Sequence, residues 1–358
     1  MPIKDKNLYY VGGVVRDELL GLNSIDIDYC YEGNAIDFSR KFNIIKTNPD
    51  FGTVRVLLDN KEIDIASTRV EIYPKEGHLP VVNKIGCSLK DDLSRRDFSI
   101  NAMAKNTLTG ELVDYFEGLA DIKNKKLRVL HERSFIEDPS RILRGLKFSI
   151  RFGFELDNTT LNLQKDYLSN INYDMSYHRL KKELKETFNL NKIEAFNKFI
   201  NDDIYKLLGE HQTKYIANPD IEKLVEKYNP NNTWLVYLGI FDLSNFDLTS
   251  EEKRIIENFN GIKNSNPKAN TEIYKLFKDC PLESILLYAN FINFDMALNY
   301  LENLADIRIE TTGKDLIKLG IPQGEIYKVI FDFIQNKKIE NKNLTLKEEL
   351  KLIRKKFL

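Results

Sequence analysis

The sequence has little of what would build a disulfide scaffold, a zinc site or a membrane span. Its 358 residues hold only 3 cysteines, Cys30, Cys87 and Cys280, and these lie far apart. That number excludes a four-cysteine zinc site and a framework of paired disulfides, and it favours a reducing compartment. No apolar run reaches the roughly 18 residues that a membrane helix needs, and the first residues lack the apolar core of a signal peptide. We therefore expect a cytoplasmic protein.

An excess of either charge is also missing. The chain carries 53 Lys and Arg against 54 Asp and Glu, for a net charge of -1. This balance excludes an overall basic coat for nucleic acid, although a local basic face remains open. With 42% hydrophobic and 30% charged residues, the composition is typical of a folded globular protein. At about 150 residues per domain, the length predicts two or three domains.

The residue patterns predict an α+β first part followed by helices. We expect strand 8–11, helix 14–20, strand 25–31, helix 35–42, strand 53–58 and strand 62–67, in that order. The segment 70–90 holds two prolines and two glycines and predicts a long loop. Beyond Asp138, apolar residues recur with helical spacing. The final residues from Lys337 contain eight Lys or Arg against three Glu, a local charge of +5.

A glycine pair stands where the first strand meets the first helix. In the sequence GGVVRD, Gly12 and Gly13 let backbone amides approach a ligand, and the helix N-terminus and Arg16 favour an anion. This segment is a candidate cradle for a triphosphate. A tight turn beside a surface arginine would have the same sequence.

Two aspartates alternate along the predicted second strand. Asp26 and Asp28 are two residues apart, so on a strand they would project to the same side. Asp64, or its rival Glu62, would supply a third carboxylate from another strand. Carboxylates without nearby Cys or His favour Mg²⁺ or Mn²⁺, and two such ions suit in-line displacement at phosphorus. Solvated aspartates on an edge strand are the alternative.

Two further clusters combine arginines with an aspartate. In RRDFSINAMA, Arg96 could reach a phosphate and Asp97 a sugar hydroxyl. In EDPSRILRGLKF, Asp138 lies near the start of a helix, with Arg141 and Arg144 on nearly one face. One carboxylate and two guanidiniums can bind base edges or phosphates. Ordinary helix capping and surface ion pairs would also account for this pattern.

The order and spacing of these motifs closely resemble those of bacterial tRNA nucleotidyltransferases, the class II CCA-adding enzymes, whose head is shared with bacterial poly(A) polymerases. The resemblance is dense over 8–155 and continues more loosely through SYHRLKKELKE at 176–186 and TTGKDLIKLGIPQGEI at 311–326. It implies a polymerase-β-like nucleotidyltransferase head at 1–136, a helical neck at 137–200, a helical body at 201–270 and a helical, tRNA-binding tail at 271–358.

The resemblance also implies a role for individual residues. Asp26 and Asp28 match the positions that hold two Mg²⁺ ions, and Asp64 matches the third catalytic carboxylate. The nucleotide-binding positions are matched by Gly12, Gly13, Arg16, Arg96, Asp97, Asn101, Asp138, Arg141, Arg144 and Lys147. Asp138 and Arg141 match the pair that reads the incoming base, and Arg96 and Asp97 match contacts to phosphate and sugar. Lys147 departs from the family, which often has arginine there.

The implied activity is template-independent addition of C, C and A to the 3′ end of tRNA, from CTP and ATP, with release of pyrophosphate. CC-adding relatives typically lack a loop before RRDF, and here 70–94 keeps its length. Poly(A) polymerases tend to be longer and to carry basic extensions. A-only addition stays open, as does a non-catalytic RNA-binding protein with a retired transferase head. We expect tRNA, CTP and ATP as partners, and no required protein partner or membrane.

Overall fold

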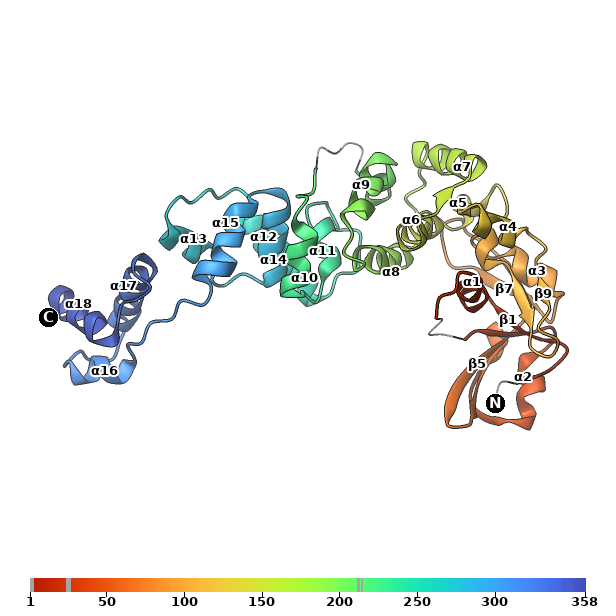
Figure 1. The fold of residues 1–358 in the computed structure, drawn as a ribbon, viewed down its shortest axis with the longest axis horizontal. Coiled ribbons are helices and arrows are strands. Elements are labelled where there is room, and N and C mark those ends of the chain that lie inside the picture. The colour runs from red at the N-terminus through yellow and green to blue at the C-terminus, as the bar shows by residue number, and fades with distance from the viewer. Residues whose placement is uncertain (1–2, 24–26, 211–212, 214) are drawn as a thin grey trace. The chain divides into compact units, whose positions relative to one another are not determined.

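The computed structural model describes residues 3–23, 27–210, 213 and 215–358. Over these residues the chain divides into two compact units, one of Met1–Thr213 with Ser244–Asp247 and the other of Lys214–Leu243 with Leu248–Leu358. All strands of the described residues belong to the first unit, and the second is helical (Figure 1). The expected fold class, a mixed-sheet head followed by helices, is confirmed. The division into head, neck, body and tail stays a prediction.

A mixed sheet forms the frame of the first unit. Its described strands follow the order β3-β4-β5-β2-β1-β8-β9, in which β2 and β5 are parallel and every other pair is antiparallel. The strands are β1 (Leu8–Val11), β2 (Tyr29–Tyr31), β3 (Asn43–Asn48), β4 (Thr53–Leu58), β5 (Lys61–Ser67), β8 (Ala104–Asn106) and β9 (Leu112–Val113). Two smaller sheets pair β6 (Arg69–Ile72) with β7 (Val81–Ile85), and β10 (Lys126–Leu127) with β11 (Glu155–Leu156).

Alternation along the strands divides the apolar residues between two buried clusters. Leu8 and Tyr29 pack in one cluster with Val56 and Ile65, while Val11 and Cys30 pack in the other. Because neighbouring strand residues point to opposite faces, β1 and β2 each contribute to both clusters. The sheet is therefore packed on both sides at its centre, and polar residues at the strand ends can form a site.

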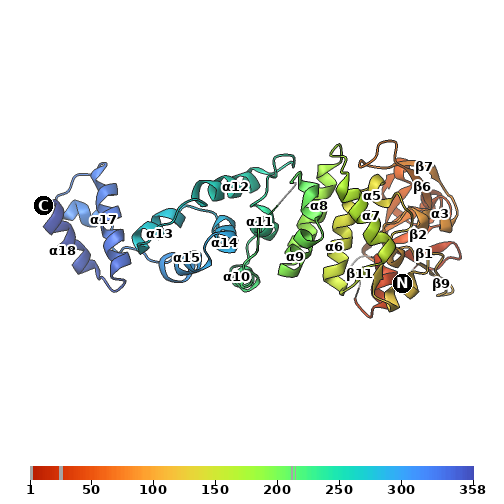
Figure 2. The ribbon, with the colours of Figure 1, turned by 90° about the horizontal axis from the view of Figure 1, so that it is seen from above.

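Helices cover the sheet and extend the first unit. They are α1 (Gly13–Leu19), α2 (Ala35–Phe38), α3 (Leu89–Ser94), α4 (Gly118–Lys123), α5 (Ser134–Glu137), α6 (Ser140–Phe152), α7 (Asn158–Ser169), α8 (Tyr177–Phe188) and α9 (Ile193–Asn201). Figure 2 shows α6, α8 and α9 side by side, and each of them contacts the other two. Helix α6 ends at Gly153, whose φ of 66° is a left-handed conformation that glycine adopts without strain.

Several expected elements differ from the observed ones. The predicted strand 25–31 begins only at Tyr29; Ile27 is 50% exposed, and residues 24–26 lie outside the described residues. The predicted loop 70–90 instead contains β6 and β7, which form a hairpin. Strand β3 was not predicted, because all six of its residues are exposed and alternation is therefore absent.

The second unit consists of helices. They are α10 (Ile221–Tyr228), α11 (Thr233–Leu238), α12 (Ser250–Ile262), α13 (Asn270–Phe277), α14 (Leu282–Phe291), α15 (Phe294–Asn299), α16 (Gly313–Lys318), α17 (Ile326–Glu340) and α18 (Leu346–Phe357). Leu316, Ile330, Ile334 and Ile353 join α16, α17 and α18 through one apolar cluster. None of the helices in the described part of the chain combines the length and apolar character needed to cross a membrane.

Candidate active site

Most of the residues singled out in the sequence line one cavity of the first unit. This cavity has a volume of about 360 Å³. Its lining is Gly12, Gly13, Arg16, Asp28, Glu71, Tyr73, Pro80, Arg95, Arg96, Asp97, Asn101, Asp138, Arg141, Arg144 and Arg179. We call it the nucleotide cavity. Segments far apart in the chain thus meet at the ends of β1 and β2 and at the beginning of α6.

The glycine pair lies at the start of α1, where the sequence predicted it. Gly12 has a φ of 70°, and a Cβ at this position would lie 2.8 Å from Nη1 of Arg96. A side chain at this position would therefore be strained by the backbone conformation and would push the end of the Arg96 side chain aside. The result is a backbone that a ligand can approach closely, with a guanidinium beside it.

Arg16 is buried in the wall of the cavity. Its Nη1 donates to Oδ1 of Asn101 at 2.6 Å, and its Nε and Nη2 donate to Oδ1 of Asp17 at 2.9 and 2.7 Å. The guanidinium also lies over the rings of Phe148 and Phe152. Burial lowers the pKa of Arg16 below its ordinary value. These contacts fix the guanidinium in place before any ligand binds.

Arg96 retains unused hydrogen-bonding capacity within the cavity. Its Nη2 lies 3.3 Å from Oδ2 of the fully buried Asp92. Its Nε is buried and has no hydrogen-bond partner among the described residues. A buried donor without a partner costs free energy, and an anionic ligand would remove that cost.

Asp97 is held ionised at the centre of a hydrogen-bond network. Arg144 donates to its Oδ2 through Nε at 2.6 Å and Nη2 at 2.5 Å, while Asn101 and the Phe98 amide donate to its Oδ1 at 2.9 and 2.8 Å. Burial by itself would raise the pKa of Asp97, but the charge of Arg144 and these hydrogen bonds outweigh it and lower the pKa to about 2.

Asp138 and Arg141 lie where α6 begins. The Ser140 amide donates to Oδ1 of Asp138 at 3.1 Å, so this aspartate caps the first turn of α6, as the sequence predicted. Arg141 is 3% exposed and donates to Oγ of Ser134 and to the carbonyl of Arg95. The Arg141 Nε lies 3.8 Å from Oδ2 of Asp138, so the carboxylate and the guanidinium stand next to each other.

Helix α8 supplies contacts that sequence reasoning missed. Arg179 pairs with Asp138, and Glu183 pairs with Arg144 at 3.3 Å and with Lys147 at 2.6 Å. Arg179 and Glu183 are four residues apart, which places both on one face of a helix. That spacing was a usable signal in SYHRLKKELKE. Lys147 does not line the cavity; its Nζ lies 2.6 and 2.5 Å from carboxylate oxygens of Glu183 and Glu186.

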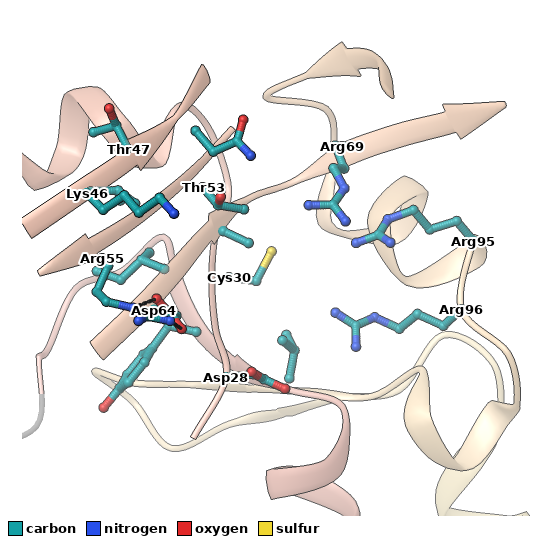
Figure 3. A pocket seen from close by; sticks show the side chains of 16 residues that line it. Asp28, Cys30, Lys46, Thr47, Thr53, Arg55, Asp64, Arg69, Arg95 and Arg96 are labelled. Carbon is teal, nitrogen blue, oxygen red and sulfur yellow. Dashed lines mark hydrogen bonds and ion pairs between the residues drawn. The ribbon is translucent and has the colours of Figure 1, made fainter. Parts of the chain in front are cut away.

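A second cavity, of about 470 Å³, adjoins the first and shares Asp28, Arg95 and Arg96 with it. Asp64 lies in this cavity and not in the nucleotide cavity (Figure 3). Its carboxylate accepts two hydrogen bonds from Arg55, at 2.7 and 2.8 Å, and Glu62 lies 3.3 Å from the same guanidinium.

The donor set suits a hard cation. Strands β2 and β5 pair in parallel with Tyr29 opposite Ile65. Asp28 and Asp64 each come one residue before this pair, so they lie opposite each other. Their oxygen atoms match the ligands that Mg²⁺ prefers. Asp26 lies outside the described residues, and the described residues contain no group of three acidic, His or Cys side chains that could hold a metal ion.

Comparisons with known proteins establish the family of the chain. Residues 8–128 match the model of the poly(A) polymerase head domain. An A-adding tRNA nucleotidyltransferase of Halalkalibacterium halodurans is 31% identical over 90% of this chain and 82% of its own length. The chain belongs to the tRNA nucleotidyltransferase family. It is a nucleotidyltransferase, and the expected family is confirmed.

Other members of the family differ in length and in the nucleotides that their names specify. An A-adding tRNA nucleotidyltransferase of Geobacter sulfurreducens is 32% identical over 96% of this chain, which spans only 44% of that relative. A CCA-adding enzyme of Ligilactobacillus salivarius is 28% identical over 96% of this chain and 93% of its own length. The sequence comparisons therefore include both A-adding and CCA-adding tRNA nucleotidyltransferases.

Solved structures share the fold of this tRNA nucleotidyltransferase. An apo CCA-adding enzyme superposes with a TM-score of 0.79 at 28% identity, covering 97% of this chain and 91% of its own. The Thermotoga maritima CCA-adding enzyme complexed with tRNA has a TM-score of 0.76 at 27% identity, with coverage of 98% and 91%. CCA-adding enzymes complexed with ATP and with CTP both have TM-scores of 0.75, at 26% and 27% identity, and each covers at least 96% of this chain and 88% of its own.

Proposed function

We propose that this nucleotidyltransferase adds C, C and A to the 3′ end of tRNA, taking CTP and ATP and releasing pyrophosphate. The observation that carries the proposal is the nucleotide cavity, where a carboxylate–guanidinium pair, a buried arginine donor and Asp28 stand in one enclosure. Solved relatives complexed with tRNA, with ATP and with CTP support the choice of substrates.

Each end of the cavity suits one part of a nucleoside triphosphate. Gly12, Gly13 and the guanidinium of Arg96 suit the phosphates, because the glycine backbone lies beside a guanidinium whose Nε has no hydrogen-bond partner among the described residues. Asp138 and Arg141 suit the base, since together they accept and donate hydrogen bonds along one edge. Asp97 lines the same cavity and suits the ribose. Protein side chains then select the nucleotide, and no template strand is needed.

Asp26 and Asp28, with Asp64 nearby, would hold two Mg²⁺ ions. When bound, such ions would activate the attacking 3′-hydroxyl and stabilise the charge on the leaving pyrophosphate. Asp64 can take part only after its carboxylate leaves Arg55, or while it shares its oxygens with that guanidinium. The arginines of the nucleotide cavity would orient the phosphates, and positioning together with charge stabilisation would supply most of the acceleration.

Addition of A alone is the second candidate, and the sequence comparisons favour it. The Halalkalibacterium and Geobacter relatives both carry the name A-adding. CC-only addition is less well supported. The segment that CC-adding relatives lack is present here as β6, β7 and α3, and it contributes Glu71, Tyr73 and Pro80 to the nucleotide cavity.

A gel assay with three tRNA substrates tests the proposal. The tRNAs end at the discriminator base, at C and at CC, and each is incubated with Mg²⁺ and with CTP or ATP alone or together. We expect CTP to extend the first two substrates and ATP to extend the third. Extension of the CC-ending tRNA alone would establish A-only addition and refute full CCA addition.

Two variants serve as controls for the assay. Asp28→Ala removes a proposed metal ligand, and Asp37→Ala removes an exposed aspartate that pairs only with the exposed Arg40 in the described part of the chain. Activity should be lost in the first variant and kept in the second. If the wild-type protein extends none of the tRNAs yet binds them, the protein is an RNA-binding protein with a retired transferase head.

A further inference from the structure

The second cavity contains Asp28 and Asp64, and it is also lined by side chains that the proposed function does not use. It adjoins the nucleotide cavity at Asp28, Arg95 and Arg96, and most of its other lining residues come from β3, β4, β5 and the start of β6. In Figure 3, Lys46 and Thr53 stand on the strand side, Arg69, Arg95 and Arg96 reach in from the other side, and Asp28 lies below them. We call it the strand cavity.

We infer that the strand cavity binds the 3′-terminal nucleotides of the acceptor RNA, with Lys46 and Asn48 as contacts to its backbone. The inference rests on the proposed function and adds to it a binding site for the second substrate. An in-line displacement brings the attacking oxygen from the side opposite the leaving group. With the triphosphate in the nucleotide cavity, the attacking 3′-hydroxyl must reach Asp28 by another route, and the strand cavity adjoins the nucleotide cavity at Asp28.

A row of charged side chains crosses the strand cavity toward Asp28. Lys46 of β3 is the register partner of Arg55 of β4, and Arg55 is the partner of Asp64 of β5. Direct partners on neighbouring strands share a face, so this row runs from the edge of the sheet to the proposed metal site. A polynucleotide backbone following the row would bring its last sugar close to Asp28.

The lysine at the end of this row differs from the arginines around it. Arg55 pairs with Asp64, Arg69 pairs with Glu71, and Arg95 pairs with Asp92 and Glu71. The side chains of Lys46 and Asn48 make no hydrogen bond or ion pair with any described residue, and both lie on one face of β3. A cation and an amide that have no partner among the described residues, in a cavity beside a reaction centre, suit the phosphates and sugar hydroxyls of RNA.

Size and strand position agree with an RNA occupant. A volume of about 470 Å³ lies in the range of roughly 300–1,000 Å³ typical of small-ligand sites, and it suits the end of a strand rather than a duplex. Strand β3 is at the edge of the sheet, with all six residues exposed. A chain can therefore enter the cavity over β3 without displacing another element of the first unit.

Steady-state kinetics of Lys46→Ala and Asn48→Ala test the inference, with Lys61→Ala as a matched control. Lys61 is exposed on β5 of the same sheet and lines neither cavity. The substrate is the CC-ending tRNA with ATP, which both candidate functions accept. We expect Lys46→Ala to raise the KM for tRNA about tenfold, the loss of one charge-assisted hydrogen bond, and Asn48→Ala to raise it less. The KM for ATP should stay within about twofold, because no nucleotide-cavity residue changes.

Binding and cross-linking provide readouts that do not depend on turnover. The logarithmic salt slope of tRNA binding should become shallower by about 0.7 in Lys46→Ala, the value for one phosphate contact to a single strand. A tRNA with a photoreactive base as its terminal nucleotide should cross-link to the peptide that contains β3. Unchanged tRNA KM and salt slope in Lys46→Ala, or cross-links that all map away from β3 and β4, would overturn the inference.

Free pyrophosphate is the competing occupant for a basic cavity. If Lys46→Ala weakens inhibition by pyrophosphate while the KM for tRNA stays unchanged, the strand cavity binds the product and the inference is wrong. If the wild-type protein fails to extend any tRNA, the proposed function is refuted but the inference about the strand cavity is not. The salt slope and the cross-link would still show whether the RNA end binds in the strand cavity.

Discussion

Replacing Asp97 with asparagine tests whether the nucleotide cavity depends on a buried, ionised carboxylate. Asp97 is 7% exposed and accepts hydrogen bonds from Arg144, Asn101 and the Phe98 amide. Asparagine keeps the shape and one acceptor oxygen but presents an amide NH₂ or a weaker acceptor to Arg144. Among the described residues, that guanidinium would then keep Glu183, at 3.3 Å, as its ion-pair partner.

The pKa of Asp97 sets the size of the expected effect. The pKa falls from the ordinary value of 3.8 to about 2 in the folded protein, so the ionised form stabilises the fold above pH 4. At about 1.4 kcal/mol per pKa unit, this amounts to roughly 2–3 kcal/mol at pH 7. The stabilisation is lost as the pH falls toward 2, and we expect it to shrink by about 1 kcal/mol between pH 7 and pH 3.

Pulse-labelling hydrogen exchange measures the free energy of unfolding of the first unit, which contains Asp97. Wild type and Asp97→Asn are equilibrated in urea at pH 7 and at pH 3, given a short deuterium pulse, and read by mass spectrometry on peptides of α6. We expect the variant to be less stable by about 2–3 kcal/mol at pH 7, and the gap to narrow at pH 3. The matched control Asp37→Asn alters an exposed pair and should change stability by less than about 0.5 kcal/mol. Equal stability of Asp97→Asn and wild type at pH 7, or a gap that does not depend on pH, would refute the reasoning.

Three other predictions follow from the proposed roles. Asp28→Ala should lower nucleotide addition by more than about 10³-fold and leave tRNA affinity within about twofold; turnover within tenfold of wild type in saturating Mg²⁺ would refute the metal assignment. Arg141→Ala should change the ratio of CTP to ATP incorporation by at least about tenfold, and an equal loss of rate for all four nucleotides would indicate a structural role instead. Removal of the chain from Lys337 would break the fold, because Lys338 pairs with Glu310 and Glu349 and Ile353 packs in the α16–α18 cluster. The exposed Arg354 and Lys355 should therefore be changed to glutamate instead. This double variant should weaken tRNA binding and flatten its salt dependence, while the affinity for ATP stays unchanged.

The sequence predicted the parts of the fold where local chemistry and burial agree. Strands β1 and β4 have the expected bounds, and the turn between β4 and β5 contains Asp59 and Asn60, both with positive φ. Such residues tolerate the left-handed region, so the turn could be recognised from the sequence. Where burial and pattern disagree, as in the exposed strand β3, only pairing with β4 defines the strand.

The site was predictable because each motif stands at the end of an element. Gly12 follows a strand, Asp97 follows α3 and Asp138 precedes α6, so a compact fold could bring them together. Two features were not predictable in the same way. Asp64 lies in the neighbouring cavity, because the register of β4 and β5 pairs it with Arg55. Lys147 faces α8, because two glutamates on that helix attract its ammonium group.

The arginines of the nucleotide cavity already have anionic partners before any substrate binds. Arg16 pairs with Asp17, Arg96 with Asp92, Arg144 with Asp97 and Glu183, and Arg179 with Asp138. These pairs lower the net positive charge that a triphosphate meets, which weakens attraction at long range. They also fix every guanidinium in position, so little side-chain entropy is lost on binding and little reorganisation is needed as charge develops during the reaction. Helix α8 takes part through Arg179 and Glu183. Arg179 pairs with Asp138, which is proposed to face the base. Glu183 pairs with Arg144, whose other partner is Asp97, the residue proposed to face the ribose. A substitution at Glu183, which does not line the nucleotide cavity, should therefore alter nucleotide selection without any direct contact to the nucleotide, because it would release Arg144 from a fixed position.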